Sequence, residues 1–171
     1  MTVLIDGRAA DVVPVTDRGL NYGDGLFETI AVFDGRPCLW DRHLSRLVSG
    51  CQRLGFSFPD PEQLRQEADQ LCLGVDRGVL KILLTRGEGG RGYRPPADPV
   101  GRRILSLHEW PDYPENFQSE GVAVRWCETP LGTNPLLAGI KHCNRLEQVL
   151  ARAEWDDADI PEGLMCDVDG H

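Results

Sequence analysis

The chain has 171 residues, of which 41% are hydrophobic and 26% charged, a composition typical of an ordinary globular domain. Its net charge of −9, from 18 basic and 27 acidic residues, disfavours binding to a nucleic-acid backbone. The sequence contains neither a run of about 18 apolar residues nor a basic segment followed by an apolar leader. We therefore expect a cytoplasmic protein with no membrane partner.

The first forty residues predict two β-hairpins. Residues 3–5 are expected to pair with 10–15, and residues 26–33 with 37–40. An Asp-Gly pair separates the strands in each case, and this pair supplies the positive φ angles of a type I′ turn.

Two amphipathic helices are predicted next. The first begins with Asp41 as its N-cap and ends at Gly55, and the second has Asp60 as its N-cap and Pro61 as its first residue. The apolar stripe of the first helix consists of Leu44, Leu47, Val48, Cys51 and Leu54. Both helices are expected to pack on one face of a sheet.

Three further strands are predicted at residues 78–85, 103–108 and 122–126. A polar, proline-marked stretch follows the last of them and indicates a domain boundary. The sequence thus predicts an α+β N-terminal domain over residues 1–127 and the start of a second domain over residues 128–171.

The last residues predict a helix over 144–153 and a strand over 163–168 that ends in a turn. A hairpin with one strand leaves an unpaired sheet edge. We therefore expect either an N-terminal part of a longer protein or a chain that needs another to complete its sheet.

The sequence argues against metal and nucleotide sites. The six cysteines form no Cys-x-x-Cys pair and the four histidines form no His-x-x-x-His pair, so neither a metal site nor a disulfide is expected. Residues 87–92 match G-x-G-x-x-G, but Tyr93-Arg94-Pro95-Pro96 cannot open the helix that a dinucleotide site requires. This loop is either a flexible connection or a mobile active-site loop in which Arg91 and Tyr93 offer donors to an anionic substrate.

Lys141 is the strongest candidate for chemistry. Only two of the 18 basic residues are lysines, Lys81 and Lys141, and Lys141 lies in an apolar run next to a glycine. An ammonium can lose its proton when desolvated, whereas a guanidinium cannot. Lys141 is therefore either a salt-bridged or snorkelling lysine or a Schiff-base lysine, with Lys81 as the rival amine. Arg46 either reaches solvent or offers its fork to a phosphate.

Four stretches of the sequence resemble the class IV family of pyridoxal-phosphate enzymes, and within it the aminodeoxychorismate lyases. They read "DRGLNYGDGLFETIAVFDGRP", "RHLSRL", "GVLKILLTRGEGGRGY" and "LGTNPLLAGIKHCNRLEQVLAR". The resemblance implies a class IV fold with a complete N-terminal domain of sheet and helices and the beginning of the larger cofactor-binding domain.

The resemblance also implies roles for particular residues. Lys141 would hold pyridoxal 5′-phosphate as a Schiff base and transfer protons, and Arg46 would contact the cofactor's phosphate. The residues implied to line the substrate pocket are Tyr22, Phe27, Arg91 and Tyr93. The implied reaction converts 4-amino-4-deoxychorismate into 4-aminobenzoate and pyruvate for folate biosynthesis, in a homodimer with no metal.

In the family, a glutamate that pairs with the pyridine nitrogen and a second phosphate-binding turn come after the point that corresponds to residue 171. The 171-residue form alone is therefore expected to bind the cofactor weakly or not at all, and to be inactive. Two alternatives remain open: a class IV aminotransferase of branched-chain or D-amino acids, and a truncated, non-catalytic binding or assembly domain.

Overall fold

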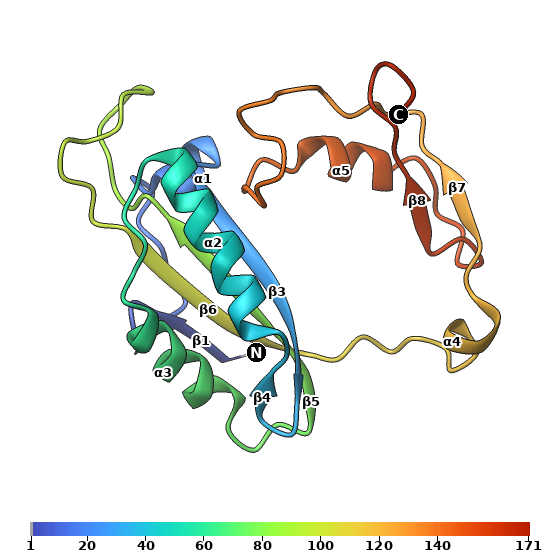
Figure 1. Ribbon diagram of the computed structural model, residues 1–171, viewed down its shortest axis with the longest axis horizontal. Coiled ribbons are helices and arrows are strands. Elements are labelled where there is room, and N and C mark those ends of the chain that lie inside the picture. Colours follow the sequence, from blue (N-terminus) through green and yellow to red (C-terminus); the bar gives the residue numbers. More distant parts are fainter. Residues whose placement is uncertain (1) are drawn as a thin grey trace. The chain divides into compact units, whose positions relative to one another are not determined.

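The computed structural model describes residues 2–171 and divides them into two compact units (Figure 1). The first unit comprises the chain up to Trp110 together with Gly139–Asn144, and the second comprises Pro111–Ala138 and Arg145–His171. In the described part of the chain, no helix combines the length and apolar character needed to cross a bilayer.

The first unit is built on a six-stranded antiparallel sheet with strand order β2-β1-β6-β5-β3-β4. Its strands are β1 (Thr2–Ile5), β2 (Arg8–Ala9), β3 (Gly25–Phe33), β4 (Arg36–Pro37), β5 (Arg77–Thr85) and β6 (Arg102–Glu109). The predicted hairpin between β3 and β4 is confirmed. Its turn residues Asp34 and Gly35 have φ angles of 47° and 74°, as a type I′ turn requires.

The predicted return strand over residues 10–15 is wrong, because β2 ends at Ala9. Val12 and Val15 in this segment are 74% and 80% exposed, so they have no core face to pack against. The chain instead turns toward the short helix α1 (Arg18–Tyr22), which the sequence did not predict. Asp17 caps this helix by accepting a hydrogen bond from the backbone N–H of Gly19.

The two predicted helices are α2 (Trp40–Leu54) and α3 (Pro61–Cys72), and both lie on the same face of the sheet (Figure 1). Asp60 caps α3 as predicted, by accepting from the N–H of Glu62 at 3.0 Å. Asp41 does not cap α2, because the helix begins two residues earlier than predicted, at Trp40. Its N-cap is Leu39 at a positive φ of 51°, which leaves Asp41 in the first turn.

The alternation of side chains along the central strands separates a buried sheet face from an open one. On the face covered by the helices, Ile30, Leu80 and Ile82 have no exposed surface and form the middle of the core. The residues between them point to the other face, where Lys81 is exposed and is the cross-strand partner of Thr29. The open face therefore carries polar groups beside apolar ones.

The second unit contains α4 (Phe117–Glu120), β7 (Val124–Trp126), α5 (Leu146–Arg152) and β8 (Glu162–Leu164). Strand β7 pairs in parallel with β8 and not with the large sheet, so its residues belong to the second unit. The compact units therefore change at residue 110. The domain boundary at residue 127 stays a prediction about the protein's domains.

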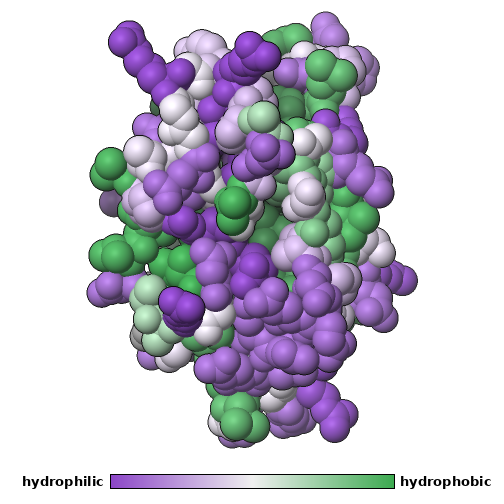
Figure 2. Space-filling view, turned by 90° about the vertical axis from the view of Figure 1, so that its left-hand side faces the viewer, coloured by the Kyte–Doolittle hydropathy of each residue, from purple (hydrophilic) through white to green (hydrophobic). Residues whose placement is uncertain are grey.

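Hydrophilic residues predominate on the face of the molecule that Figure 2 shows, with apolar residues scattered among them. Single exposed apolar side chains of this kind are normal for a folded surface. This view agrees with the charged composition of the chain.

Candidate active site

The segment that carries Lys141 is bonded along one edge of the large sheet. The N–H of Phe27 donates to the carbonyl of Lys141 at 3.0 Å, and the N–H of Cys143 donates to the carbonyl of Gly25 at 2.9 Å. A Cβ at Gly25 would lie 2.5 Å from the carbonyl oxygen of Leu84, so only glycine permits this packing. Backbone pairing to the start of β3 thus fixes the position of Lys141.

Both lysines of the chain approach the same aromatic ring. The Nζ of Lys141 lies 4.5 Å from the centroid of the Phe27 ring, and the Nζ of Lys81 lies 5.7 Å from it. Both distances are within the range of cation–π attraction. Lys81 lies in the middle of β5 and is exposed on the open face of the sheet, so its amine is accessible.

Arg46 forms a two-pronged ion pair with Glu28, on the helix-covered face of the sheet. Its Nε donates to one carboxylate oxygen at 2.6 Å and its Nη2 to the other at 2.5 Å. His43 Nδ1 lies 2.7 Å from the second of these oxygens. Glu28 is completely buried, and a buried carboxylate without such partners would be strongly destabilising.

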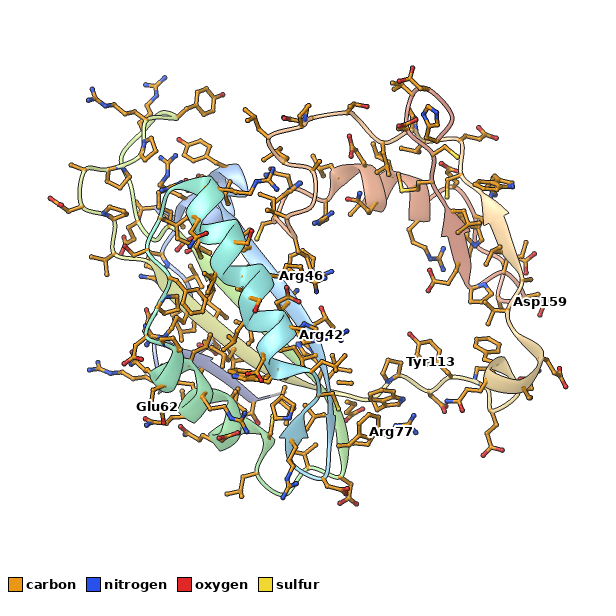
Figure 3. All side chains as sticks on the ribbon, in the orientation of Figure 1. Arg42, Arg46, Glu62, Arg77, Tyr113 and Asp159 are labelled. Carbon is orange, nitrogen blue, oxygen red and sulfur yellow. The ribbon has the colours of Figure 1, made fainter. Side chains whose placement is uncertain are left out.

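The Arg46 side chain remains 48% exposed, so its guanidinium is both anchored and accessible. Hydrogen bonding to Glu28 raises the pKa of Arg46, which keeps it cationic at any working pH. Arg42 lies one turn earlier on α2, and both residues can be followed in Figure 3. Neither Glu28 nor His43 was predicted from the sequence. For Glu28 a signal existed, because it is a charged residue on the buried side of an apolar strand.

Tyr22 and Tyr93 are brought together by the loop after β5. Their rings form an edge-to-face pair with centroids 5.5 Å apart, and the Tyr22 hydroxyl accepts a hydrogen bond from the N–H of Gly92 at 3.0 Å. Tyr93 is 86% exposed and Arg91 is also exposed. The loop after β5 therefore carries Arg91 and Tyr93 and places Tyr93 against Tyr22. Lys141 is placed near Phe27, and Arg46 is paired with Glu28.

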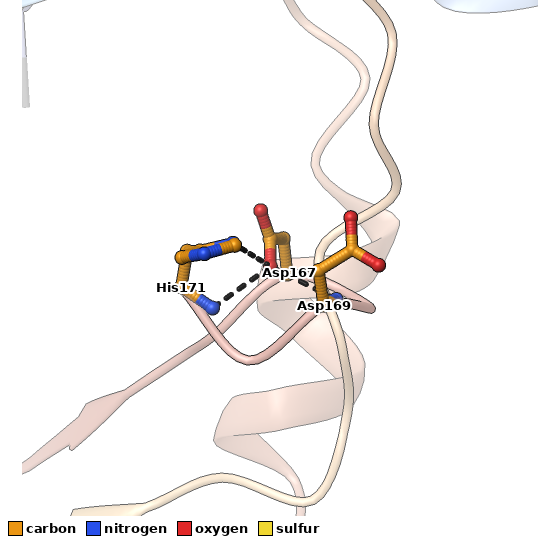
Figure 4. Close-up of side chains that lie close together, drawn as sticks. All are labelled: Asp167, Asp169 and His171. Atoms are coloured by element: carbon orange, nitrogen blue, oxygen red, sulfur yellow. Dashed lines mark hydrogen bonds and ion pairs between the residues drawn. The ribbon is translucent and has the colours of Figure 1, made fainter.

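Asp167, Asp169 and His171 form a separate cluster in the second unit (Figure 4). The carboxylate of Asp167 accepts hydrogen bonds from the N–H groups of Asp169 and His171 at 3.0 and 2.9 Å. The His171 ring, 83% exposed, lies 3.6 Å from the same carboxylate. These bonds are those of an ordinary turn and account for the proximity of the three residues.

The class of protein follows from comparison with known families. The family model "Amino-transferase class IV" matches residues 25–171, so the chain belongs to this family. This finding confirms the predicted family and its α+β fold.

Within the family, the chain is similar to lyases. It is 36% identical to the aminodeoxychorismate lyase of Vibrio harveyi, over 98% of this chain and 62% of that protein. It is 55% identical to the crystal structure of the 4-amino-4-deoxychorismate lyase of Pseudomonas aeruginosa, with a TM-score of 0.92 over 98% of this chain and 62% of that chain.

The fold also extends to aminotransferases. The branched-chain amino acid aminotransferase of Escherichia coli matches with a TM-score of 0.83 at 21% identity, over 99% of this chain and 60% of that one. The chain thus spans about three-fifths of the length of these relatives.

Proposed function

We propose that the protein is a pyridoxal-phosphate-dependent lyase that converts 4-amino-4-deoxychorismate into 4-aminobenzoate and pyruvate. The observation that supports this proposal best is the likeness to the Pseudomonas lyase, at 55% identity with a TM-score of 0.92. The likeness to the E. coli aminotransferase is far lower in sequence, at 21%.

The chemistry of the side chains fits the proposed cofactor. An aldehyde needs an amine, and Lys141 is held in place by the backbone bonds of its segment to β3. A phosphate needs a fixed cation with N–H donors. The Nε and Nη2 of Arg46 bond to Glu28, which orients the guanidinium and leaves its Nη1 side for a phosphate. When bound, pyridoxal phosphate supplies an electron sink for the carbanion formed at the substrate.

Lys141 has two tasks under this proposal. Its amine would be the group that holds the cofactor, and its Nζ would also serve as a base toward the substrate. The proton that it removes lies on the ring carbon next to the substrate nitrogen. The same Nζ, which lies 4.5 Å from the centroid of the Phe27 ring, would return a proton to the departing enolpyruvyl side chain.

The remaining residues provide contacts for an anionic substrate. Lys81 presents its exposed amine on the same sheet face as Phe27, where it can meet a carboxylate. Arg91 and Tyr93 offer donors from the loop after β5, and Tyr22 supports that loop. Phe27 provides an apolar surface for the substrate ring.

The test is a comparison of Lys141→Ala with Lys81→Ala in the full-length protein. Pyruvate release from aminodeoxychorismate, measured without a keto-acid acceptor, should be lost in the first variant and retained, with a raised KM, in the second. Borohydride reduction of the cofactor-loaded protein should label the peptide that contains Lys141. Labelling of Lys81 would overturn the assignment, as would undiminished turnover by Lys141→Ala.

A class IV aminotransferase is the second candidate. The chain is 27% identical, over 96% of its length, to the D-alanine aminotransferase of Bacillus licheniformis, of which it covers 59%. Lys141 and Arg46 would serve such an enzyme in the same way. Amino-group transfer to a keto acid, with no pyruvate released from aminodeoxychorismate, would favour this alternative.

We also propose that the protein is a cytoplasmic homodimer. The dimer is implied by the resemblance to the class IV family. Light scattering on the full-length protein would measure the subunit number. A monomer that retains full activity would contradict this part of the proposal.

A further inference from the structure

A buried arginine fixes the loop that carries Arg91 and Tyr93. The side chain of Arg18 is only 4% exposed. Its Nη1 donates to the carbonyl of Gly92 at 3.1 Å, and its Nη2 donates to the carbonyl of Tyr93 at 3.0 Å. The guanidinium fork therefore holds two consecutive carbonyls of the loop formed by residues 87–93.

The same arginine is anchored to the body of the first unit through Asp24. Arg18 Nε and Arg86 Nε donate to one oxygen of this carboxylate, at 2.8 and 2.7 Å. Arg86 in turn donates to the carbonyls of Leu54 and Gly55 at the end of α2, at 2.7 and 3.0 Å. The loop is thus connected through two arginines and one carboxylate to a packed helix.

Two further contacts complete the arrangement. Tyr22 lies under the guanidinium, with the Arg18 carbon Cζ 4.8 Å from its ring centroid, and its hydroxyl accepts from the N–H of Gly92. A Cβ at Gly89 would come within 2.8 Å of Arg18 Cδ, so the loop lies directly on the arginine stem only because this residue is glycine.

We propose that Arg18 is a positioning residue for the substrate: it holds residues 87–93 in one conformation before substrate arrives, so that Arg91 and Tyr93 are already placed to bind it. Ordering a loop in advance removes the entropy loss that would otherwise oppose binding. The identity of the substrate rests on the proposed function, whereas the fixing of the loop does not.

The experiment measures the loop directly, in the full-length protein without substrate. Hydrogen exchange of residues 87–93 and trypsin cleavage after Arg91 are compared between the wild type and Arg18→Lys, which keeps the charge but loses the fork. Gly89→Ala is a second variant. Its added Cβ would clash with the Arg18 side chain and so separate the loop from the arginine. The matched control is Arg103→Lys, since Arg103 is also largely buried, at 14% exposure, and pairs with Glu67 away from the loop.

Exchange and cleavage should both rise at least about tenfold in Arg18→Lys and in Gly89→Ala, as expected from the loss of one hydrogen bond to a charged donor. The control should match the wild type. In the cofactor-loaded protein, Arg18→Lys should raise KM about tenfold and change kcat less than about twofold, with cofactor binding unchanged.

Unchanged loop exchange in both variants would overturn the proposal. A parallel loss of kcat and cofactor binding would also overturn it, because it would indicate a general structural role. If Arg18→Lys does not fold, Gly89→Ala decides the matter by the same loop readout. If the wild type releases no pyruvate, the proposed function fails, but the exchange data still show whether Arg18 fixes the loop.

Discussion

Glu28→Gln tests whether the buried carboxylate orients Arg46. Glu28 has no exposed surface, and its carboxylate accepts hydrogen bonds from two nitrogens of Arg46. The Nδ1 of His43 lies within hydrogen-bonding distance of the same carboxylate. Glutamine keeps the shape but leaves one acceptor oxygen and turns N–H groups toward donors. Breaking one partner of a buried ion pair costs about 3–5 kcal/mol. Because Arg46 is 48% exposed and can turn to water, we expect a loss of about 2–3 kcal/mol.

A loss of about 2–3 kcal/mol corresponds to a fall in Tm of about 4–12 °C for a chain of this size. Urea unfolding of Glu28→Gln would measure it, with Glu62→Gln as the control, because Glu62 is an exposed carboxylate on α3 and should change stability by less than about 0.5 kcal/mol. The freed Arg46 should also bind pyridoxal phosphate about tenfold more weakly. A change below about 0.5 kcal/mol in Glu28→Gln would show that the ion pair does not hold Arg46.

Three other outcomes follow from the structure. Burial raises the pKa of Cys51 to about 12 and that of Cys72 to about 11. Iodoacetamide at pH 8 should therefore label the four partly exposed cysteines before these two. Equal labelling rates for buried and partly exposed cysteines would contradict this expectation. Burial alone would raise the pKa of Asp24, but hydrogen bonds from its two arginine partners lower it overall. The ionised Asp24 carboxylate therefore stabilises the fold fully above the unfolded pKa near 3.8, and this stability is lost as pH falls through the lower folded pKa. Between pH 5 and pH 2 the Tm of the wild type should fall more steeply than that of Asp24→Asn. Gly87 has a φ of 81°, and an added Cβ would lie 1.9 Å from the Val100 carbonyl oxygen. Gly87→Ala should therefore lower the free energy of unfolding, measured in urea, by more than about 1 kcal/mol. An unchanged urea midpoint would contradict the expected strain.

Local signals in the sequence were sufficient for most of the first unit. The Asp-Gly turn after β3 and the proline-opened start of α3 both determine backbone angles within a few residues, so their positions could be predicted. Strand β7 could not be assigned to its unit in this way. Its partner β8 lies more than thirty residues later in the chain, and no local pattern specifies a parallel pairing over such a distance.

A candidate site residue can be named from the sequence where its residue type suggests a chemistry, and cannot be named where its role depends on neighbours across the fold. Lys141 could be named as a candidate because lysine is rare in this chain and because it follows the apolar run that contains Gly139. Arg18 and Glu28 could not be named, because their importance comes from tertiary partners: loop carbonyls in one case and a helix arginine in the other. A charged residue on the buried side of a strand, as Glu28 is, is the signal that sequence reasoning should have used.

Arginine and lysine make different contacts in this protein, and the difference follows from their chemistry. Arg18, Arg46 and Arg86 each use two or three nitrogens to hold carbonyls or a carboxylate in a fixed geometry, which a planar guanidinium does well. Lys81 and Lys141, the two lysines, both approach one aromatic ring instead. A fixed contact gains nothing from an amine, but bond formation with an aldehyde and proton transfer both require a nitrogen that can be neutral. Lys81 and Lys141 are therefore the two amine side chains of this sequence that can supply such a nitrogen, and the proposed function assigns that task to Lys141.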